Sequence, residues 1–296
     1  MLDDLDQAEF TALTAKFSPE AIILLRTTSS HKLYRLTWGQ SSYILKWCNF
    51  PSRCNEPKIY TLLNRYDIPT LPVYAHTDRA LVLEDLLSSP ERRLAEPLDM
   101  ERAPTGVALA EWYRSLHQAG REALKASSLL LEGVFPWVSE ITTPALAKAG
   151  ALLKLDRIPA WGLAMQQVEA LKEKYLALPQ TFNYNDFAVE NLALSRDTEK
   201  PLRAIVFDYD CFASGVAYSD WRNVMVSLQG AAKESFQENY GVIAESERRL
   251  DQPLSILYGL VVASQRNKIP LWANPLQESV INGELECMIR EALGTY

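Results

Sequence analysis

The sequence predicts an α+β protein of two lobes, in which a small strand-rich lobe is followed by a larger and mostly helical lobe. Residues 22–48 contain three apolar segments separated by polar turns, a pattern typical of consecutive strands. From residue 56 the spacing of the apolar residues becomes helical, and helical spacing dominates beyond residue 87. A chain of 296 residues is long enough to form a core in both lobes.

Three strands are expected at AIILL, KLYRLTW and SSYILKW. In the third segment Tyr43 and Leu45 alternate with Ile44 and Lys46, so neighbouring side chains face opposite sides of a pleated sheet. Two more strands are expected at LPVYA and ALVLED. Together these segments predict a small antiparallel sheet.

One main helix is expected in the first lobe, beginning at Glu56. Ile59, Leu62 and Leu63 lie at positions i, i+3 and i+4 of one helix face. Pro57 is compatible with the first helical turn, where its missing N–H costs nothing.

The polar segment LSSPERRLAEP marks a change in composition near residue 87. This change predicts a boundary between a lobe of residues 1–86 and a lobe of residues 87–296. The second lobe opens with an amphipathic helix, because Leu109, Trp112, Tyr113 and Leu116 occupy positions i, i+3, i+4 and i+7. Further helices are expected at residues 144–155, at residues 162–177 and from residue 220 onward.

The segment TFNYNDFAVENLAL, residues 181–194, is expected to contain a short strand on each side of a loop. RAIVFDYD predicts another strand, which the turn SRDTEKP connects to the one before it. Such a hairpin would bring Asn191 and Asp208 together, and their oxygens could then hold a hard cation such as Mg²⁺. Asp210 is the alternative ligand, although a solvated loop position is expected for it.

The charge of the chain bears on its partners. It has 30 basic and 37 acidic residues and a net charge of -7, which argues against a broad interface with nucleic acid. A cationic small substrate suits this charge better. No apolar stretch approaches the roughly 20 residues of a membrane span, and MLDDLDQAEF does not have the basic and then apolar pattern of a signal peptide. We therefore expect a cytoplasmic protein without a membrane partner.

Five polar residues stand out by their order along the chain: Lys46, Glu56, Asp186, Asn191 and Asp208. Each alone has an ordinary explanation, as a solvated strand end, a first-turn acid or a turn former. Their order along the chain matches the order of parts in kinase-type phosphoryl transfer. These parts are a strand lysine, a helix glutamate, a connection, helices, D-x-x-x-x-N and an aspartate after a strand. That chemistry requires charges and metal ions positioned around a phosphoryl group.

The sequence resembles the aminoglycoside phosphotransferase and choline kinase family, a branch of the protein-kinase-like fold, from about residue 20 to residue 230. The family loop commonly reads H-G-D or H-N-D, four residues, then N, and here Tyr184 and Asn185 precede Asp186 and the loop closes at Asn191. The resemblance implies that Asp186 is the catalytic base. It implies that Asn191 and Asp208 are Mg²⁺ ligands.

The same resemblance assigns the nucleotide site. It implies that Lys46, in YILKW, binds the α and β phosphates and pairs with Glu56. LVLEDL is the implied hinge, and the residues that would contact adenine are Leu83, Glu84, Asp85 and Leu86, with Ile44 against the purine.

Two further residues are assigned by the resemblance. WYRSLHQAG resembles a helix ending of the family, with Gly120 as its C-cap. Asp220 matches a family aspartate at a helix start that supports the catalytic loop, so we expect a structural role for it.

Three features depart from the family pattern. Ile44 stands two residues before the lysine, where protein kinases place a small residue over adenine, although a bulky aliphatic side chain could still contact a purine. Tyr184 stands where histidine is usual, and the turn RTTSSHKLYRL has no G-x-G. Serine and threonine in this turn could still offer backbone N–H and hydroxyl donors to phosphate.

The sequence thus predicts an ATP- and Mg²⁺-dependent enzyme that transfers the γ phosphate to a hydroxyl of a small molecule, such as an amine-bearing alcohol or a sugar. Aromatic and acidic residues that could lie near the acceptor are Trp112, Tyr113, Trp137, Trp161, Trp221, Glu238 and Trp272. A place in the core is an equally good expectation for most of these tryptophans. The alternative is a catalytically inactive kinase-like module that binds a nucleotide or another ligand. The oligomeric state stays open.

Overall fold

The structure is a computed structural model that describes residues 4–50, 54–126, 131 and 133–294. Its contacts divide the chain into two compact units. The first comprises Met1–Ser115, Asp186–Phe212 and Met225–Tyr240, and the second comprises Leu116–Asn185, Ala213–Val224 and Gly241–Tyr296. These units are groups of residues in contact and combine separate segments of the chain, whereas the expected lobes are two consecutive segments. The expected boundary near residue 87 therefore stays a prediction.

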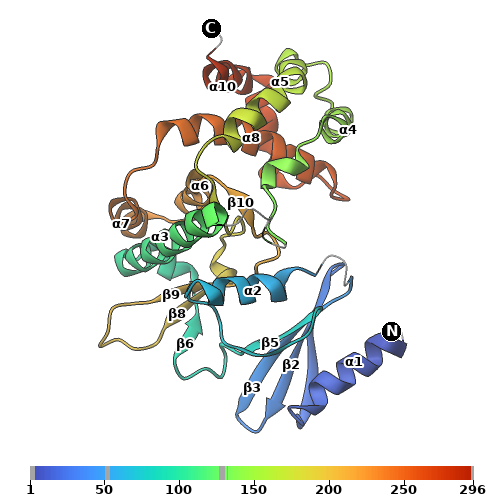
Figure 1. Ribbon diagram of the computed structural model, residues 1–296, viewed down its shortest axis with the longest axis vertical. Helices are drawn as coiled ribbons and strands as arrows, with labels where there is room; N and C mark the ends of the chain where they lie inside the picture. The colour runs from blue at the N-terminus through green and yellow to red at the C-terminus, as the bar shows by residue number, and fades with distance from the viewer. Residues whose placement is uncertain (1–3, 51–53, 127–130, 132, 295–296) are drawn as a thin grey trace. The chain divides into compact units, whose positions relative to one another are not determined.

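The first unit contains a five-stranded antiparallel sheet (Figure 1). Its strands, in the spatial order β1-β2-β3-β5-β4, are β1 (Ala21–Thr27), β2 (His31–Trp38), β3 (Ser41–Cys48), β5 (Ala80–Glu84) and β4 (Val73–His76). All five were expected from the sequence. In the register Ile44 on β3 lies opposite Arg35 on β2 and Leu83 on β5.

Strand β3 has the two faces that its alternation predicts. Leu45 and Trp47 are fully buried on one face, where they join a cluster with Phe10 and Leu13 of helix α1 (Asp4–Ala15). The rings of Phe10 and Trp47 meet edge to face at 5.5 Å. Helix α1 was not among the expected elements. The opposite face of β3 is left for Ile44 and Lys46.

Helix α2 (Glu56–Arg65) follows the first three strands, as expected. Ile59, Leu62 and Leu63 are buried, and Pro57 lies in the first turn. Glu56 is therefore the first residue of an amphipathic helix whose apolar face is held in the core. This packing restricts the path of the Glu56 side chain.

A second sheet of the first unit has the order β6-β8-β9 and comprises β6 (Arg92–Leu94), β8 (Leu192–Ser195) and β9 (Ala204–Val206). Strands β8 and β9 form the predicted hairpin, with Leu192 opposite Val206. The pairing continues past the strand ends, since the Phe207 N–H donates to the Asn191 carbonyl at 3.0 Å. Strand β6 was not expected from the sequence.

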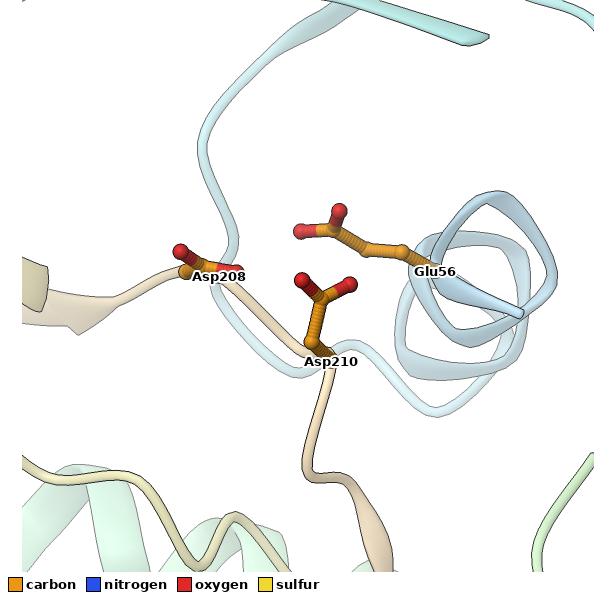
Figure 2. Close-up of side chains that lie close together, drawn as sticks. All are labelled: Glu56, Asp208 and Asp210. Carbon is orange, nitrogen blue, oxygen red and sulfur yellow. The ribbon is translucent and has the colours of Figure 1, made fainter. Parts of the chain in front are cut away.

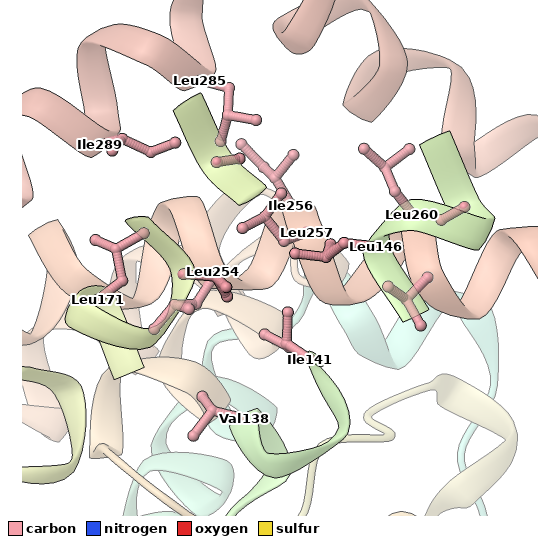
Figure 3. Packing of buried hydrophobic residues seen from close by; sticks show 14 of the residues in the cluster. Val138, Ile141, Leu146, Leu171, Leu254, Ile256, Leu257, Leu260, Leu285 and Ile289 are labelled. Carbon is pink, nitrogen blue, oxygen red and sulfur yellow. The ribbon is translucent and has the colours of Figure 1, made fainter. Parts of the chain in front are cut away.

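The second unit is mostly helical, with a two-stranded sheet of β7 (Thr181–Asn183) and β10 (Ala213–Gly215). Its core is a large cluster of aliphatic and aromatic side chains, including Leu146, Leu171, Leu254 and Leu257 (Figure 3). The helices that supply this cluster are α4 (Thr143–Leu153), α5 (Pro159–Leu176), α8 (Glu245–Ser264) and α10 (Glu284–Leu293).

The remaining helices are α3 (Ala103–Ala126), α6 (Ala217–Ser227), α7 (Gly230–Tyr240), α9 (Asn274–Ile281) and the short 3₁₀ segments η2 (Pro97–Glu101), η3 (Trp137–Glu140), η4 (Val189–Asn191) and η5 (Leu271–Ala273). The α+β class, with a small antiparallel sheet and a mostly helical remainder, is confirmed. Among the described residues, no helix combines the length and the apolar character of a membrane span.

The expectation that Gly120 caps a helix end is wrong. Helix α3 continues to Ala126, so Gly120 lies inside it. A Cβ at Gly120 would lie 2.1 Å from the Phe182 nitrogen and 2.5 Å from Thr181 Oγ1. The glycine is required because strand β7 approaches the helix closely.

Gly106 in α3 has a similar close contact within the first unit, since a Cβ there would lie 2.0 Å from the Ala232 carbonyl oxygen. Gly106→Ala should therefore destabilise the protein by about 1–3 kcal/mol through overpacking. A methyl group added at Gly162 in α5 would have no atom within 4 Å, so Gly162→Ala should stabilise by up to about 1 kcal/mol. Urea unfolding of both variants measures this difference, and equal effects would contradict the packing of α3 against α7.

Candidate functional site

Lys46 lies among three carboxylates in the first unit. Its Nζ is 2.6 Å from Glu56 Oε2, 2.6 Å from Asp208 Oδ1 and 3.2 Å from Asp210 Oδ2. Figure 2 shows the Glu56 side chain extending from α2 toward Asp208 and Asp210, which come from the loop after β9. Lys46 and Asp208 are thus in contact although they are 162 positions apart in the sequence.

Local backbone structure explains how these groups meet. Alternation along β3 directs Lys46 away from the Leu45 and Trp47 face. Strand β9 ends at Val206, and Asp208 has a left-handed backbone with φ of 70°. Aspartate tolerates this conformation better than most residues, but it still costs energy, and such strain is frequent at functional sites.

Both oxygens of Glu56 are in use. Oε2 pairs with Lys46, and Oε1 accepts a hydrogen bond from the Tyr209 N–H at 3.0 Å. Burial raises the pKa of Glu56, and the nearby ammonium opposes this shift. Burial alone would lower the pKa of Lys46, but Glu56, Asp208 and Asp210 outweigh it and raise that pKa. The three carboxylates therefore favour the charged form of Lys46.

Asp210 is exposed and lies on a loop, as expected, but it also has charged partners. Its side chain is 45% exposed, yet it pairs with Lys46 and lies 3.6 Å from His31 Nδ1. Strand alternation does not explain this position, since β9 has already ended. The turn of the loop after Asp208 returns the Asp210 carboxylate to the cluster.

Asp186 and Asn191 lie together at the other predicted loop. The Asn191 side-chain amide donates to the Asp186 carbonyl at 3.1 Å and to its Oδ2 at 3.2 Å. Burial and the charge of Asp208 raise the pKa of Asp186. The hairpin pairs the backbone of Asn191 with Phe207, but the side-chain contact of Asn191 is with Asp186 rather than with Asp208.

Asp220, in the first turn of α6, binds the chain just before Asp186. Within the second unit its carboxylate accepts the N–H of Tyr184 at 2.9 Å and that of Asn185 at 2.9 Å, and lies 3.1 Å from His117 Nε2. Asn185 has a left-handed backbone with φ of 65°. These contacts match the loop-supporting arrangement expected for Asp220. Tyr184 is fully buried, so it fills the interior at the position where histidine is usual.

A cavity of about 570 Å³ lies in the first unit beside the Lys46 cluster. Its apolar lining includes Leu33, Ile44, Leu83 and Phe207, and its charged lining includes Lys46, Glu56 and Asp208. The predicted hinge residues Glu84, Asp85 and Leu86 line it too. The size and the mixture of an apolar wall with a few polar groups are typical of a small-molecule site.

The two hinge carboxylates are bound by other side chains. Asp85 accepts from Arg35 Nε at 2.5 Å and from Ser42 Oγ at 2.6 Å. Glu84 accepts from Ser89 Oγ at 2.8 Å and pairs with Arg92 at 3.2 Å. These contacts connect residues 84 and 85 to side chains of β2, β3 and β6 and of the segment after β5.

Arg35 was not identified from the sequence. Arg35 lies two residues after Leu33, so both side chains face the same side of β2, and Leu33 lines the cavity. This spacing was the sequence signal that could have identified Arg35.

Comparison with solved structures gives matches over the whole chain. The choline kinase LicA from Streptococcus pneumoniae is 13% identical, with a TM-score of 0.62 over 95% of this chain and 99% of that chain. A choline/ethanolamine kinase family protein from Mesorhizobium loti is 15% identical, with a TM-score of 0.61 over 99% and 100%. A ternary complex of APH(2'')-IIa with streptomycin and ATP is 13% identical, with a TM-score of 0.61 over 99% and 100%.

The chain has the fold of choline kinases and aminoglycoside phosphotransferases. The motifs of the sequence predicted this resemblance. No family model matches the chain, and no curated protein matches it in a sequence search. These matching structures are those of small-molecule kinases. Because the sequence identity is low, the similarity shows a common fold and nothing more.

Within this choline kinase-like fold, most aromatic residues expected near an acceptor belong to the core. Trp112, Tyr113, Trp137 and Trp161 are all at most 7% exposed. Trp272, on η5, is 50% exposed. The tryptophan content of the sequence therefore reflects packing at most of these positions.

The acidic cluster of the fold is suited to a hard cation. Oxygens of Glu56, Asp208 and Asp210 lie within 4.8 Å of one another. Glu56 is poorly available, because its oxygens bind Lys46 and Tyr209. The Asp208 and Asp210 side chains are 32% and 45% exposed, so they retain accessible oxygens of the kind that Mg²⁺ prefers.

Lys46→Met should destabilise the protein by about 3 kcal/mol, because it leaves the buried Glu56 carboxylate without its cation. The double variant Lys46→Met, Glu56→Gln should recover part of this loss, since the uncompensated charge is gone. Urea unfolding measures both. Lys32→Met on the neighbouring strand β2 is the control and should change stability by no more than about 0.5 kcal/mol. A double variant no more stable than the single one would contradict the coupling of Lys46 to Glu56.

Proposed function

We propose that this protein is an ATP-dependent phosphotransferase that moves the γ phosphate to a hydroxyl of a small molecule. The observation that supports this proposal best is the meeting of Lys46 with Glu56, Asp208 and Asp210 beside a cavity bounded by the hinge. Phosphoryl transfer requires positioned charges more than covalent help from the protein. A helical scaffold without a ligand site would leave the meeting of these four charged groups beside a cavity unexplained.

The cavity beside the cluster is the proposed nucleotide site. Ile44, Leu83 and Phe207 supply apolar contacts for a purine. The backbone of residues 84–86 supplies its hydrogen-bonding groups, because the carboxylates of Glu84 and Asp85 are already bound elsewhere. The Glu84 N–H and the Asp85 carbonyl are not among these groups, since they bind the Pro72 carbonyl and the N–H groups of Ser88 and Ser89. Lys46, at the charged end, binds the α and β phosphates and is kept in position by Glu56.

Asp208 and Asn191 are the proposed ligands of Mg²⁺, and Asp210 is a third candidate because its carboxylate joins the same cluster. The metal would supply positive charge to the phosphates during transfer. Asp208 and Asp210 provide carboxylates with exposed oxygens. The side-chain oxygen of Asn191 is the proposed metal-binding atom, while its Nδ2 keeps the hydrogen bond to Asp186.

Asp186 is the proposed catalytic base. The acceptor hydroxyl gives its proton to the Asp186 carboxylate while its oxygen bonds to the γ phosphorus, and the bond to the β phosphate oxygen breaks to release ADP. Burial and Asp208 raise the pKa of Asp186, which makes it a better proton acceptor than an ordinary aspartate. Asn191 orients the carboxylate through its hydrogen bond.

An amine-bearing alcohol or sugar is the proposed acceptor. The net charge of -7 favours a cationic substrate, and solved structures with this fold include choline kinases and a complex with streptomycin and ATP. A screen of amino alcohols, hydroxylated amines and sugars for ATP consumption tests the proposal. A cytoplasmic location is part of the same proposal, because ATP is the donor.

The second candidate function is a kinase-like module that binds nucleotide without transfer. The glycine-free turn between β1 and β2 and the buried Tyr184 favour it. Thermal stabilisation by ATP without any turnover across the acceptor screen would select this alternative.

Asp186→Ala should lower turnover at least about 100-fold, because a general base is lost, while the affinity for ATP stays nearly unchanged. Asp208→Ala should instead weaken binding of the magnesium nucleotide. Steady-state kinetics and calorimetric titration with ATP, with and without Mg²⁺, separate the two effects. Activity that survives both substitutions would show that these roles are wrongly assigned.

A further inference from the structure

The turn between β1 and β2 has no glycine, yet it is tightly hydrogen-bonded. The Thr28 N–H donates to the His31 carbonyl at 2.8 Å. The N–H groups of Ser30 and His31 both donate to Thr28 Oγ1, at 3.3 Å and 3.0 Å. A side-chain oxygen thus occupies the position where two neighbouring amides converge.

Asn49, just after β3, binds three successive carbonyls of this turn. Its Nδ2 donates to the carbonyls of Thr28 and Ser29, both at 3.2 Å. Its backbone N–H donates to the Ser30 carbonyl at 2.7 Å. One residue therefore fixes three consecutive peptide planes.

The orientation of the amides follows from these contacts. In a trans peptide the carbonyl of one residue and the N–H of the next point in opposite directions, and no described peptide bond here is cis. With three carbonyls directed at Asn49, the N–H groups of Ser29, Ser30 and His31 point away from it. Successive amides directed to one side form a concavity that binds anions.

A cavity of about 310 Å³ lies beside the turn in the first unit. Ser29, Ser30 and His31 line it together with Lys46 and Asp210. Asn49 is not among its lining residues, consistent with its place on the carbonyl side. The cavity therefore brings the turn and the ammonium of Lys46 to one volume, together with the carboxylates of Glu56 and Asp210. Lys46 and Glu56 also line the 570 Å³ cavity, so a phosphate at Lys46 in the proposed nucleotide site would lie next to the turn.

We propose that Asn49 is a positioning residue that makes the Thr28–His31 turn a phosphate-binding element without glycine. By holding the carbonyls, Asn49 directs the three amides at the terminal phosphates of the nucleotide, and Thr28 Oγ1 occupies their place until a phosphate oxygen displaces it. This inference rests on the proposed ATP site. It also accounts for the absence of G-x-G, since side chains supply the order that glycine-rich backbones achieve through conformation.

Calorimetric titration with three ligands tests the proposal: adenosine, inorganic tripolyphosphate and ATP, all in magnesium buffer. Asn49→Ala should weaken ATP and tripolyphosphate about 10-fold or more, as expected from the loss of two hydrogen bonds that orient the turn. Adenosine affinity should stay unchanged, because the hinge does not involve Asn49. Asn49→Asp, which keeps the side-chain shape but removes the amide donors, should behave like Asn49→Ala.

Two further variants complete the test. Asn64→Ala, which removes another asparagine of the same unit whose side chain accepts a hydrogen bond from Thr70, should leave all three affinities unchanged. Thr28→Val, which removes the hydroxyl but keeps the shape, should bind ATP at least as tightly as the native protein. Unchanged ATP affinity in both Asn49 variants would overturn the proposal, as would a loss in Thr28→Val equal to that in Asn49→Ala. Failure of the native protein to bind adenosine and ATP would instead refute the proposed function.

Discussion

The buried pairing of Lys46 with Glu56 is the interaction on which the rest of the site depends. Taking an ammonium and a carboxylate out of water is costly, and the cost is recovered only when geometry and further hydrogen bonds are good. Here the second Glu56 oxygen binds the Tyr209 N–H, so the helix, the strand and the loop after β9 are fixed against one another. Asp208 and Asp210 then face the same ammonium with oxygens still open to solvent. An arrangement of this kind can receive phosphate and metal without rebuilding the fold.

Much of the site is positioned through the backbone. The left-handed residues Asn185 and Asp208 occur just before the proposed base and at the proposed metal ligand. Asp220 binds the amides of Tyr184 and Asn185, which limits where the chain can place Asp186. Asn185 and Asp208, both short polar residues, therefore adopt the left-handed conformation that glycine adopts most readily.

The order of residues along the chain was sufficient to predict the five strands of the main sheet, helix α2 and the β8–β9 hairpin. These elements have strong period-two or helical patterns, and the family resemblance implied the ion pair of Lys46 with Glu56, which the structure contains. Strands β6 and β10 were missed, although β7 and β9 are equally short and were expected, because their residues RRL and ASG carry no apolar strand pattern. Gly120 was misread as a cap, since its close contact with Phe182 depends on a strand about 60 residues away.

Local pattern thus specified the α+β class, because alternation and helical spacing are properties of neighbouring positions. The order of the motifs along the chain and the family resemblance indicated the residues of the candidate site. The position of Asp210 in the cluster, the pairing of Asn191 with Asp186 and the contact of Asn49 with the turn emerged only in three dimensions. Each depends on loops whose course is set by distant contacts rather than by any repeating pattern. The burial of Trp112 and Trp161 also emerged only in three dimensions. The sequence does not distinguish an aromatic residue of a core from one of a binding site, because the difference lies in its neighbours in space.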